Sequence, residues 1–222
     1  MQDFFENNIA GQIASKLAER IIVGDIPPKT PLRQDSIAED FKTSHVPVRE
    51  AFRLLEAQDL VVSEPRKGVR VAPLNAHSIM ELSEMRAALE ALALRDAIPN
   101  MTKSDIEKIE SLVEEDEAAD PEDIISLEKL NRAFHSSLAQ PCQRLRLQST
   151  IQQLRLTSSR ILLAMWRQLP KWQTRSSSEH REILNAVKTQ QVDLAIDLLT
   201  QHIIEGGKTL SEMVHKNIPP DD

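Results

Sequence analysis

Several residue types are scarce in this chain of 222 residues. It has one cysteine (Cys142), five glycines, no tyrosine and only 3% aromatic residues. A single cysteine cannot form an intramolecular disulfide and fits a reducing compartment. No stretch approaches the ~18 consecutive apolar residues of a membrane-spanning helix. The N-terminal segment, residues 1–6, is too acidic and too weakly apolar for a signal peptide. We therefore expect a cytoplasmic protein.

What the chain does contain is typical of a helical protein with a substantial core. Hydrophobic residues make up 41% of the sequence. Leu, Ala, Glu, Arg and Gln are abundant, whereas alternating runs of β-branched residues are rare. The length suggests one large domain or two small ones.

The formal net charge of −7 is unevenly distributed. Residues 1–73 hold 10 Lys and Arg against 11 Asp and Glu, a net charge of −1. Residues 74–222 hold 17 against 23, a net charge of −6. Within residues 41–73 the count is 6 against 4, a net charge of +2. Because phosphate binding depends on local Lys and Arg placement, the acidic total is weak evidence against DNA binding.

The first 73 residues predict three helices followed by a β-hairpin. Apolar spacing predicts an amphipathic helix over residues 9–23, and Ser36 to Glu39 has the pattern of a capping box at the start of a short second helix. A third helix is expected from Ser44 to about Gln58. Short β-branched runs at 61–62 and 69–71 flank a basic turn. Together these elements predict a winged helix-turn-helix.

The third helix has two distinct faces. Val48, Ala51, Phe52 and Leu55 follow the spacing of a buried stripe. The opposite face carries His45, Arg49 and Arg53. Ser44 is placed to be the N-cap, and Pro47 is tolerated in the first turn. A small helix with a basic outer face is suited to the DNA major groove, so DNA binding is the leading hypothesis.

From His77 onward every segment has helical periodicity. Helices are expected near residues 77–98, 103–119, 122–139, 143–168, 176–190 and 192–214, with Ser176 to Glu179 capping the fifth. We therefore predict a mainly α protein. A predicted DNA-binding domain spans residues 1–73, and a predicted all-helical bundle spans residues 74–222.

At this point the chain resembles the GntR family of bacterial transcription regulators, in the FadR-type branch with an all-helical FCD ligand domain. The matching segments are residues 46–56, 59–61 and 65–71 in the first domain, and residues 86–90, 131–135, 179–184, 193–195 and 202–203 in the second. The resemblance implies a homodimeric repressor or activator. It also implies that a small carboxylate metabolite alters the affinity of the regulator for operator DNA.

The expected DNA contacts lie on the third helix and on the turn of the hairpin. They are Ser44, His45, Val46, Arg49, Arg53, Lys67 and Gly68. His45 stands where such proteins usually carry arginine, so the preferred operator is expected to differ from the family's common one. The alternative for Arg49 and Arg53 is a set of salt bridges with Glu50 or Glu56 on a solvated face.

A divalent metal site is expected in the second domain, with His135, His180 and His202 as ligands. Asn131 lies four residues before His135, so both project from one helical face. It stands where many relatives have a metal-binding aspartate. Three imidazoles and one oxygen donor suit Zn²⁺ or Ni²⁺, with open positions for water or ligand. Replacing a carboxylate by an amide should weaken metal binding. The alternative for each histidine alone is a hydrogen-bonded core or surface residue.

Arg86 resembles the family's arginine that meets the effector carboxylate, and Arg160 is a weaker candidate for the same cavity. A surface ion pair between Arg86 and Glu90 is the alternative. The chain is not expected to be an enzyme, because it lacks H-E-x-x-H, a nucleophile elbow, a P-loop and a Gly-rich dinucleotide turn. A metal-dependent hydrolase or lyase using the histidines is the second hypothesis, and a helical protein-interaction module is the third.

Overall fold

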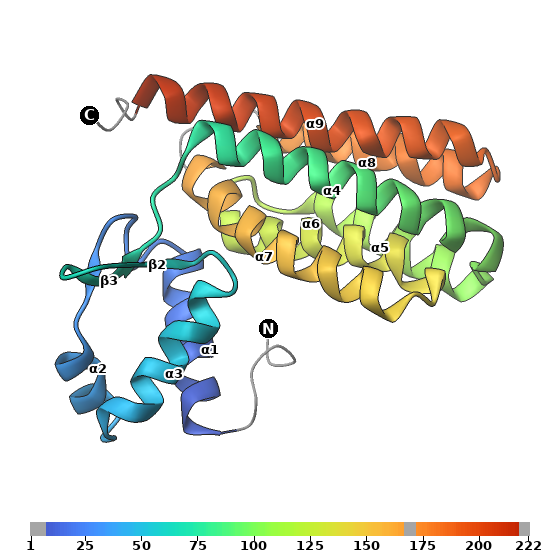
Figure 1. Cartoon of the computed structure of the whole chain (residues 1–222). Coiled ribbons are helices and arrows are strands. Elements are labelled where there is room, and N and C mark those ends of the chain that lie inside the picture. The colour runs from blue at the N-terminus through green and yellow to red at the C-terminus, as the bar shows by residue number, and fades with distance from the viewer. Residues whose placement is uncertain (1–7, 167–171, 218–222) are drawn as a thin grey trace. The chain divides into compact units, whose positions relative to one another are not determined.

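The computed structural model of the protein describes residues 8–166 and 172–217. The chain divides into two compact units, Met1–Leu74 and Asn75–Asp222. The first is a small helical unit with a three-stranded sheet, and the second is a bundle of long helices (Figure 1). The predicted fold class is therefore confirmed.

The first unit is built from three helices, α1 (Ile9–Ile22), α2 (Gln34–Asp40) and α3 (His45–Glu56). The side chain of Asn8 caps α1 by accepting a hydrogen bond of 2.8 Å from the Gly11 amide. The stripe predicted for α3 is buried, and Ala51 and Leu55 have no exposed surface at all. This stripe packs against α1, so the opposite side of α3 faces solvent.

The capping box predicted at Ser36 is wrong. Helix α2 begins two residues earlier, at Gln34, and its N-cap residue Arg33 makes no side-chain cap. The reason is tertiary: the chain enters α2 directly from the two-residue strand β1 (Pro31–Leu32), which pairs with a strand about forty residues later. Ser36 therefore lies inside the helix. At α3 the expected N-cap residue, Ser44, is in place, but its side chain makes no capping hydrogen bond.

The hairpin is formed by β2 (Val61–Glu64) and β3 (Gly68–Val71), and β1 adds a third strand on the other edge of β3. All pairs are antiparallel, with Val61 opposite Val71 and Glu64 opposite Gly68. The turn residues Arg66 and Gly68 have φ angles of 67° and 83°. Gly68 accepts this left-handed conformation without steric cost, which allows the tight turn.

The second unit contains six long helices in its described part. They are α4 (Ala76–Ala97), α5 (Lys103–Ala118), α6 (Ile124–Ala139), α7 (Leu145–Trp166), α8 (Trp172–Lys188) and α9 (Val192–Asn217). Short 3₁₀ helices, η2 (Ile98–Asn100) and η3 (Gln140–Cys142), follow α4 and α6. Helices α4 and α9 run side by side over much of their length (Figure 1). The core includes Leu94, Phe134 and Leu199, each at most 1% exposed.

One predicted helix start in this unit is wrong. Helix α8 begins at Trp172 rather than at Ser176, so the serines expected to cap it lie within its second turn. Ser176 and Ser177 are buried, and the Ser177 hydroxyl donates a hydrogen bond of 2.8 Å to Asp116 on α5. The polar run is therefore part of a helix, with Ser176 and Ser177 facing inward and the Ser177 hydroxyl bonded to a carboxylate on a neighbouring helix.

Candidate functional site

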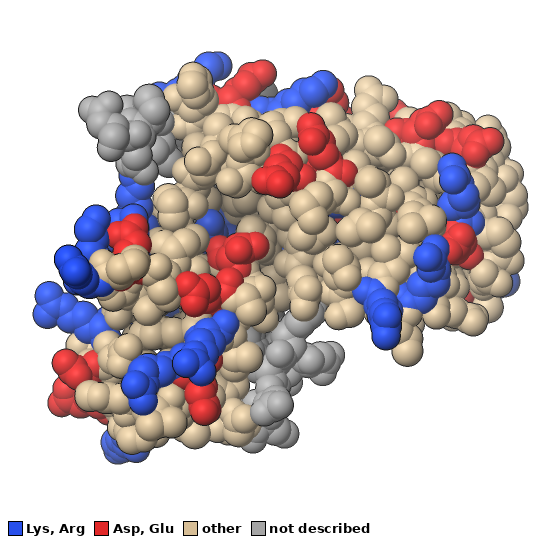
Figure 2. All heavy atoms as spheres, viewed as in Figure 1, with Lys and Arg blue, Asp and Glu red and all other residues tan. Residues whose placement is uncertain are grey.

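The outer face of α3 is exposed along its whole length. Ser44, His45, Val46, Arg49 and Arg53 are all exposed, and the apolar side chain of Val46 is 53% exposed. Lys and Arg side chains are visible over much of this unit, interspersed with acidic ones (Figure 2). An exposed valine beside exposed arginines matches a surface that contacts thymine methyl groups as well as polar groups of DNA.

The salt bridges considered for the α3 arginines do not form. Among the described residues, no ion pair joins Arg49 or Arg53 to an acidic neighbour. Glu56 instead accepts a hydrogen bond of 3.0 Å from the Ser63 amide on strand β2 of the hairpin. His45 does have a partner, since its Nε2 lies 3.1 Å from Oδ1 of Asp35 on α2. The two arginines are thus available to phosphate or base edges, whereas His45 shares its imidazole with an acid.

The tip of the hairpin presents Lys67 and Gly68 to solvent. The Lys67 side chain is 77% exposed, and its Nζ lies 3.5 Å from Oε2 of Glu64. Arg70 also contacts Glu64, which anchors the acid to the strand. An exposed ion pair of this kind contributes little to stability, so Lys67 can exchange its partner for a phosphate at small cost.

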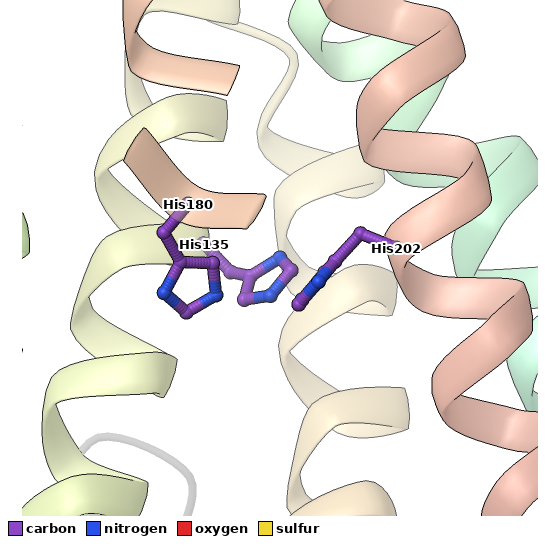
Figure 3. A group of neighbouring side chains, drawn as sticks. All are labelled: His135, His180 and His202. Carbon is purple, nitrogen blue, oxygen red and sulfur yellow. The ribbon is translucent and has the colours of Figure 1, made fainter. Parts of the chain in front are cut away.

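Three buried histidines converge inside the second unit. His135 on α6, His180 on α8 and His202 on α9 point toward one another (Figure 3). One nitrogen of each ring lies within 4.8 Å of those of the other two. Two imidazole nitrogens on a tetrahedral zinc ion are about 3.3 Å apart, so small side-chain movements would bring the three nitrogens to metal-binding distance.

Each histidine is oriented by a carboxylate on its Nδ1. The distances are 2.9 Å from His135 to Glu90, 3.3 Å from His180 to Asp116 and 2.8 Å from His202 to Glu179. A carboxylate on Nδ1 selects the tautomer that leaves Nε2 free to bind a metal. Sequence reasoning missed these three acids, because each comes from a different helix than its histidine.

Burial keeps the imidazoles of His135 and His180 unprotonated at neutral pH. It lowers the pKa of His180 to about 4, despite the opposing effect of Asp116. It also lowers the pKa of His135 well below its usual range, although Glu90 opposes this. Within the part of the chain that the structure describes, the buried Nε2 of His180 has no hydrogen-bond partner. A neutral imidazole with an unsatisfied buried nitrogen is the state that a metal ion requires.

A cavity of about 40 Å³ lies beside this histidine cluster, defined as His135, His180 and His202. Asn131, His135 and His202 contribute to its wall, and Arg86 brings a guanidinium group. Asn131 is 9% exposed and shares its helical face with His135, as predicted from the spacing. The backbone of α9 forms another part of the wall at Gly206 and Gly207. A Cβ atom at Gly207 would overlap the side chain of Ser83 on α4, so the two helices are in close contact there.

Arg86 and Glu90 do form the i,i+4 pair that was the alternative for Arg86, but the pair is buried rather than on the surface. Oε1 of Glu90 lies 3.0 Å from both Nε and Nη2 of Arg86. Arg155 on α7 binds both oxygens of Glu90, at 3.1 and 2.7 Å, and also donates to the carbonyl of His135 at 2.8 Å. Burial raises the pKa of Glu90, but Arg155, Arg86 and His135 together hold it well below its usual range.

The second arginine predicted to bind the effector does not lie at the cavity as Arg86 does. Arg160 is buried on α7, at 6% exposed, but it is not among the residues that line the cavity. Arg155, more than one turn earlier on the same helix, takes part in the network around Glu90. Helical spacing alone did not distinguish the two arginines, because the choice depends on how α7 is rotated against α4 and α6.

Comparison with known proteins decides the family. Residues 9–71 match the family of bacterial regulatory proteins named gntR, and residues 81–205 match the FCD domain. The chain belongs to the GntR family. It is therefore a transcription regulator with an N-terminal DNA-binding domain and an FCD domain, not an enzyme.

Several relatives of this GntR-family regulator match over most of their length. A probable D-xylose utilization operon transcriptional repressor of Paenarthrobacter nicotinovorans is 30% identical, over 88% of this chain and 85% of the relative. The repressor RspR of Escherichia coli K12 is 26% identical, over 93% and 90%. A solved GntR-family regulator from Pseudomonas syringae pv. tomato is 31% identical, with a TM-score of 0.57 over 94% of this chain and 86% of that one.

The structure of McbR/YncC from E. coli supports the fold of the GntR-family chain further. It has a TM-score of 0.79 at 21% identity, and the match covers 93% of this chain and 98% of that one. In the described residues of the regulator, no helix has both the length and the apolar character needed to cross a membrane.

Proposed function

We propose that this regulator binds operator DNA as a homodimer. Its affinity for the operator falls or rises when a metal ion and a small carboxylate occupy the FCD domain. The observation that carries the proposal is the histidine cluster, whose Nδ1 atoms are all held by carboxylates and whose rings each bring one nitrogen within 4.8 Å of the other two. A purely structural histidine has no need of an unsatisfied buried nitrogen.

The metal proposal assigns His135, His180 and His202 as ligands and Asn131 as a neighbouring oxygen donor. A bound Zn²⁺ or Ni²⁺ ion would supply a Lewis acid to which a carboxylate ligand can attach. Metal analysis of protein purified without chelator should find about one ion per chain, and His135→Ala should lose it. Asn185→Ala on the exposed part of α8 is the matched control. Equal metal in all three proteins contradicts the assignment.

The DNA proposal places the N-terminal end of α3 in the major groove and the wing beside the minor groove. The assigned contacts are Ser44, His45, Val46, Arg49, Arg53, Lys67 and Gly68. Exposure of all seven residues supports this, together with the absence of ion pairs at Arg49 and Arg53 among the described residues. Base-edge contacts concentrate at the start of a recognition helix.

Arg49→Ala is the direct test of the DNA proposal. Operator affinity should fall about tenfold, and the slope of log affinity against log salt should decrease by about one. DNA from the neighbourhood of the chain's own gene serves as the probe in a salt titration. Arg95→Ala removes an exposed arginine from the other unit and should leave both quantities unchanged. If Arg49→Ala and Arg95→Ala bind alike, Arg49 is not a DNA contact.

We propose that Arg86 binds the carboxylate group of the effector. Its guanidinium lines the cavity, and only Nε and Nη2 contact Glu90. Among the described residues, no ion pair or hydrogen bond occupies its Nη1, which can donate to a ligand. Arg160 does not line the cavity, but it is kept as a second candidate because it is buried on α7 next to the lining residue Ile161. Isothermal titration with a panel of small carboxylates, with and without chelator, tests the site.

The homodimer proposal is supported by an apolar strip on α4. Met85 is 46% exposed and Leu92 is 36% exposed, and seven residues separate them on one helical face. The double variant Met85→Glu/Leu92→Glu should sediment as a monomer. Ile125→Glu changes an isolated exposed residue on α6 and should not alter the molecular mass. If the double variant still sediments as a dimer, the dimer forms through another face.

A further inference from the structure

The first turn of α2 places an acid beside the start of α3. Helix α2 begins at Gln34 because it follows strand β1, which pairs with β3, and it packs against α3 (Figure 1). This start puts Asp35 in the first turn of α2. Its Oδ1 lies 3.1 Å from Nε2 of His45, the first residue of α3. The acid therefore contacts the end of α3 at which base contacts are expected.

Both side chains of this pair remain accessible. The His45 side chain is 57% exposed and the Asp35 side chain is 90% exposed. Among the described residues, neither side chain has another hydrogen bond or ion pair. An exposed pair contributes little to stability, so substitution of either residue should leave the fold intact. What the contact determines is the direction of the imidazole and the nitrogen that carries its proton.

The polar atoms that the pair leaves free are hydrogen-bond acceptors. A carboxylate bound at Nε2 selects the neutral imidazole that is protonated there, which leaves Nδ1 as an acceptor. The carboxylate can only accept hydrogen bonds, and Oδ2 of Asp35 is not used by His45. An arginine at position 45 would be the opposite case, because a guanidinium group can only donate.

A pair with acceptors alone distinguishes the base edges of the major groove. Cytosine presents the N4 amino donor, whereas guanine presents the acceptors N7 and O6. Adenine has its N6 amino donor next to the acceptor N7, and thymine presents the acceptor O4. Cytosine is therefore the base whose edge offers a donor without an acceptor beside it.

We infer that Asp35 and His45 together select cytosine at one position of the operator. Asp35 is a positioning residue for His45 and a second acceptor for the N4 amino group. This inference rests on the DNA contacts proposed above, with the start of α3 in the major groove. A carboxylate at this place also repels the DNA phosphates, so Asp35 raises the selectivity of binding while lowering the affinity for DNA of any sequence.

The test is selection of binding sites from a randomised duplex library by the full chain, in slightly alkaline buffer that keeps imidazole neutral. The operator position contacted by His45 is the one whose base preference is lost in His45→Ala. The unaltered protein should prefer cytosine there, and another base should weaken binding about tenfold. In Asp35→Ala this penalty should fall below about threefold, while affinity for unrelated DNA rises. Asp35→Ala/His45→Arg should select guanine at the same position.

Asp40→Ala is the matched control. Asp40 is an exposed acid at the other end of α2, and no ion pair links it to α3 among the described residues. Its removal takes the same charge from the first unit, but the preferred bases should not change. If Asp35 had only a structural role, Asp35→Ala would lower the affinity for every sequence instead of raising it for unrelated DNA.

The possible results separate this inference from the proposed DNA binding. If Asp35→Ala keeps the full penalty at the same cytosine, the acid has no part in base selection and the inference fails, while the DNA contacts stand. If the unaltered protein prefers another base there, or if His45→Ala loses no preference, the assignment of the pair to cytosine is wrong. If the unaltered protein selects no sequence at any salt concentration, the proposed DNA binding and the inference fail together.

Discussion

The two units of this regulator treat charged side chains in opposite ways. In the first unit, Arg49 and Arg53 stand exposed on α3 without an ion pair among the described residues. In the second, Arg86 and Arg155 are buried and share one carboxylate, Glu90. An exposed guanidinium group can replace bound water by a phosphate with little change in the stability of the fold. A buried one is held in a fixed geometry by its ion-pair partners. The first arrangement suits reversible DNA binding, and the second suits a rigid ligand site.

The largest effect is expected from removing the shared acid. Glu90→Gln leaves two buried guanidinium groups without a counter-charge, so the free energy of unfolding should fall by about 3–5 kcal/mol. Denaturant unfolding of the full chain measures the change. Glu117→Gln breaks the pair with Arg181, whose two side chains are 41% and 29% exposed, and should cost at most about 1 kcal/mol. Equal losses in the two variants would contradict the contrast between buried and exposed charge.

A smaller effect is expected at the acid that orients His180. Asp116→Asn keeps the shape of the side chain but weakens its hold on Nδ1, so Zn²⁺ affinity should drop about 10- to 100-fold. Competition with a chelating dye measures the affinity. The neighbouring acid Glu117 faces Arg181 instead, so Glu117→Gln should leave Zn²⁺ binding unchanged. A loss of affinity in both variants would point to general loosening of α5 rather than to His180.

The smallest effect is expected on the DNA side. Arg53→Ala removes an exposed cation one turn after Arg49, so operator affinity should fall a fewfold and the salt slope by about one. Its unfolding free energy should stay within about 0.5 kcal/mol of the unaltered protein, because nothing is buried or left unpaired. A clear loss of stability would show that Arg53 supports the fold of the first unit instead.

Sequence periodicity predicted most of the fold because the buried faces are regular. The stripe on α3 and the six long helices of the second unit follow from apolar spacing within each segment. The errors came where a distant partner decides the local structure. Strand β1 has only two residues and exists because it pairs with β3, and this pairing moves the start of α2.

The histidine cluster was predictable in its members but not in its electrostatics. His135, His180 and His202 have the expected spacing and meet as expected in the interior. Glu90 was expected only as a surface partner of Arg86, and Arg155 was not expected at all. Their roles depend on three helices meeting at one carboxylate, which no pattern within a single helix reveals. The burial of Ser176 and Ser177 escaped prediction for the same reason.

Gly207 has only a hydrogen atom in place of a side chain, so α9 can lie in close contact with Ser83 of α4. These two helices form two walls of the cavity. Helix α4 carries Arg86 and Glu90, and α9 carries His202. A methyl group at Gly207 would push these walls apart or displace Ser83, and the distance from the Arg86 guanidinium to the histidine cluster would change with it. Substitution at this position would therefore resize the cavity.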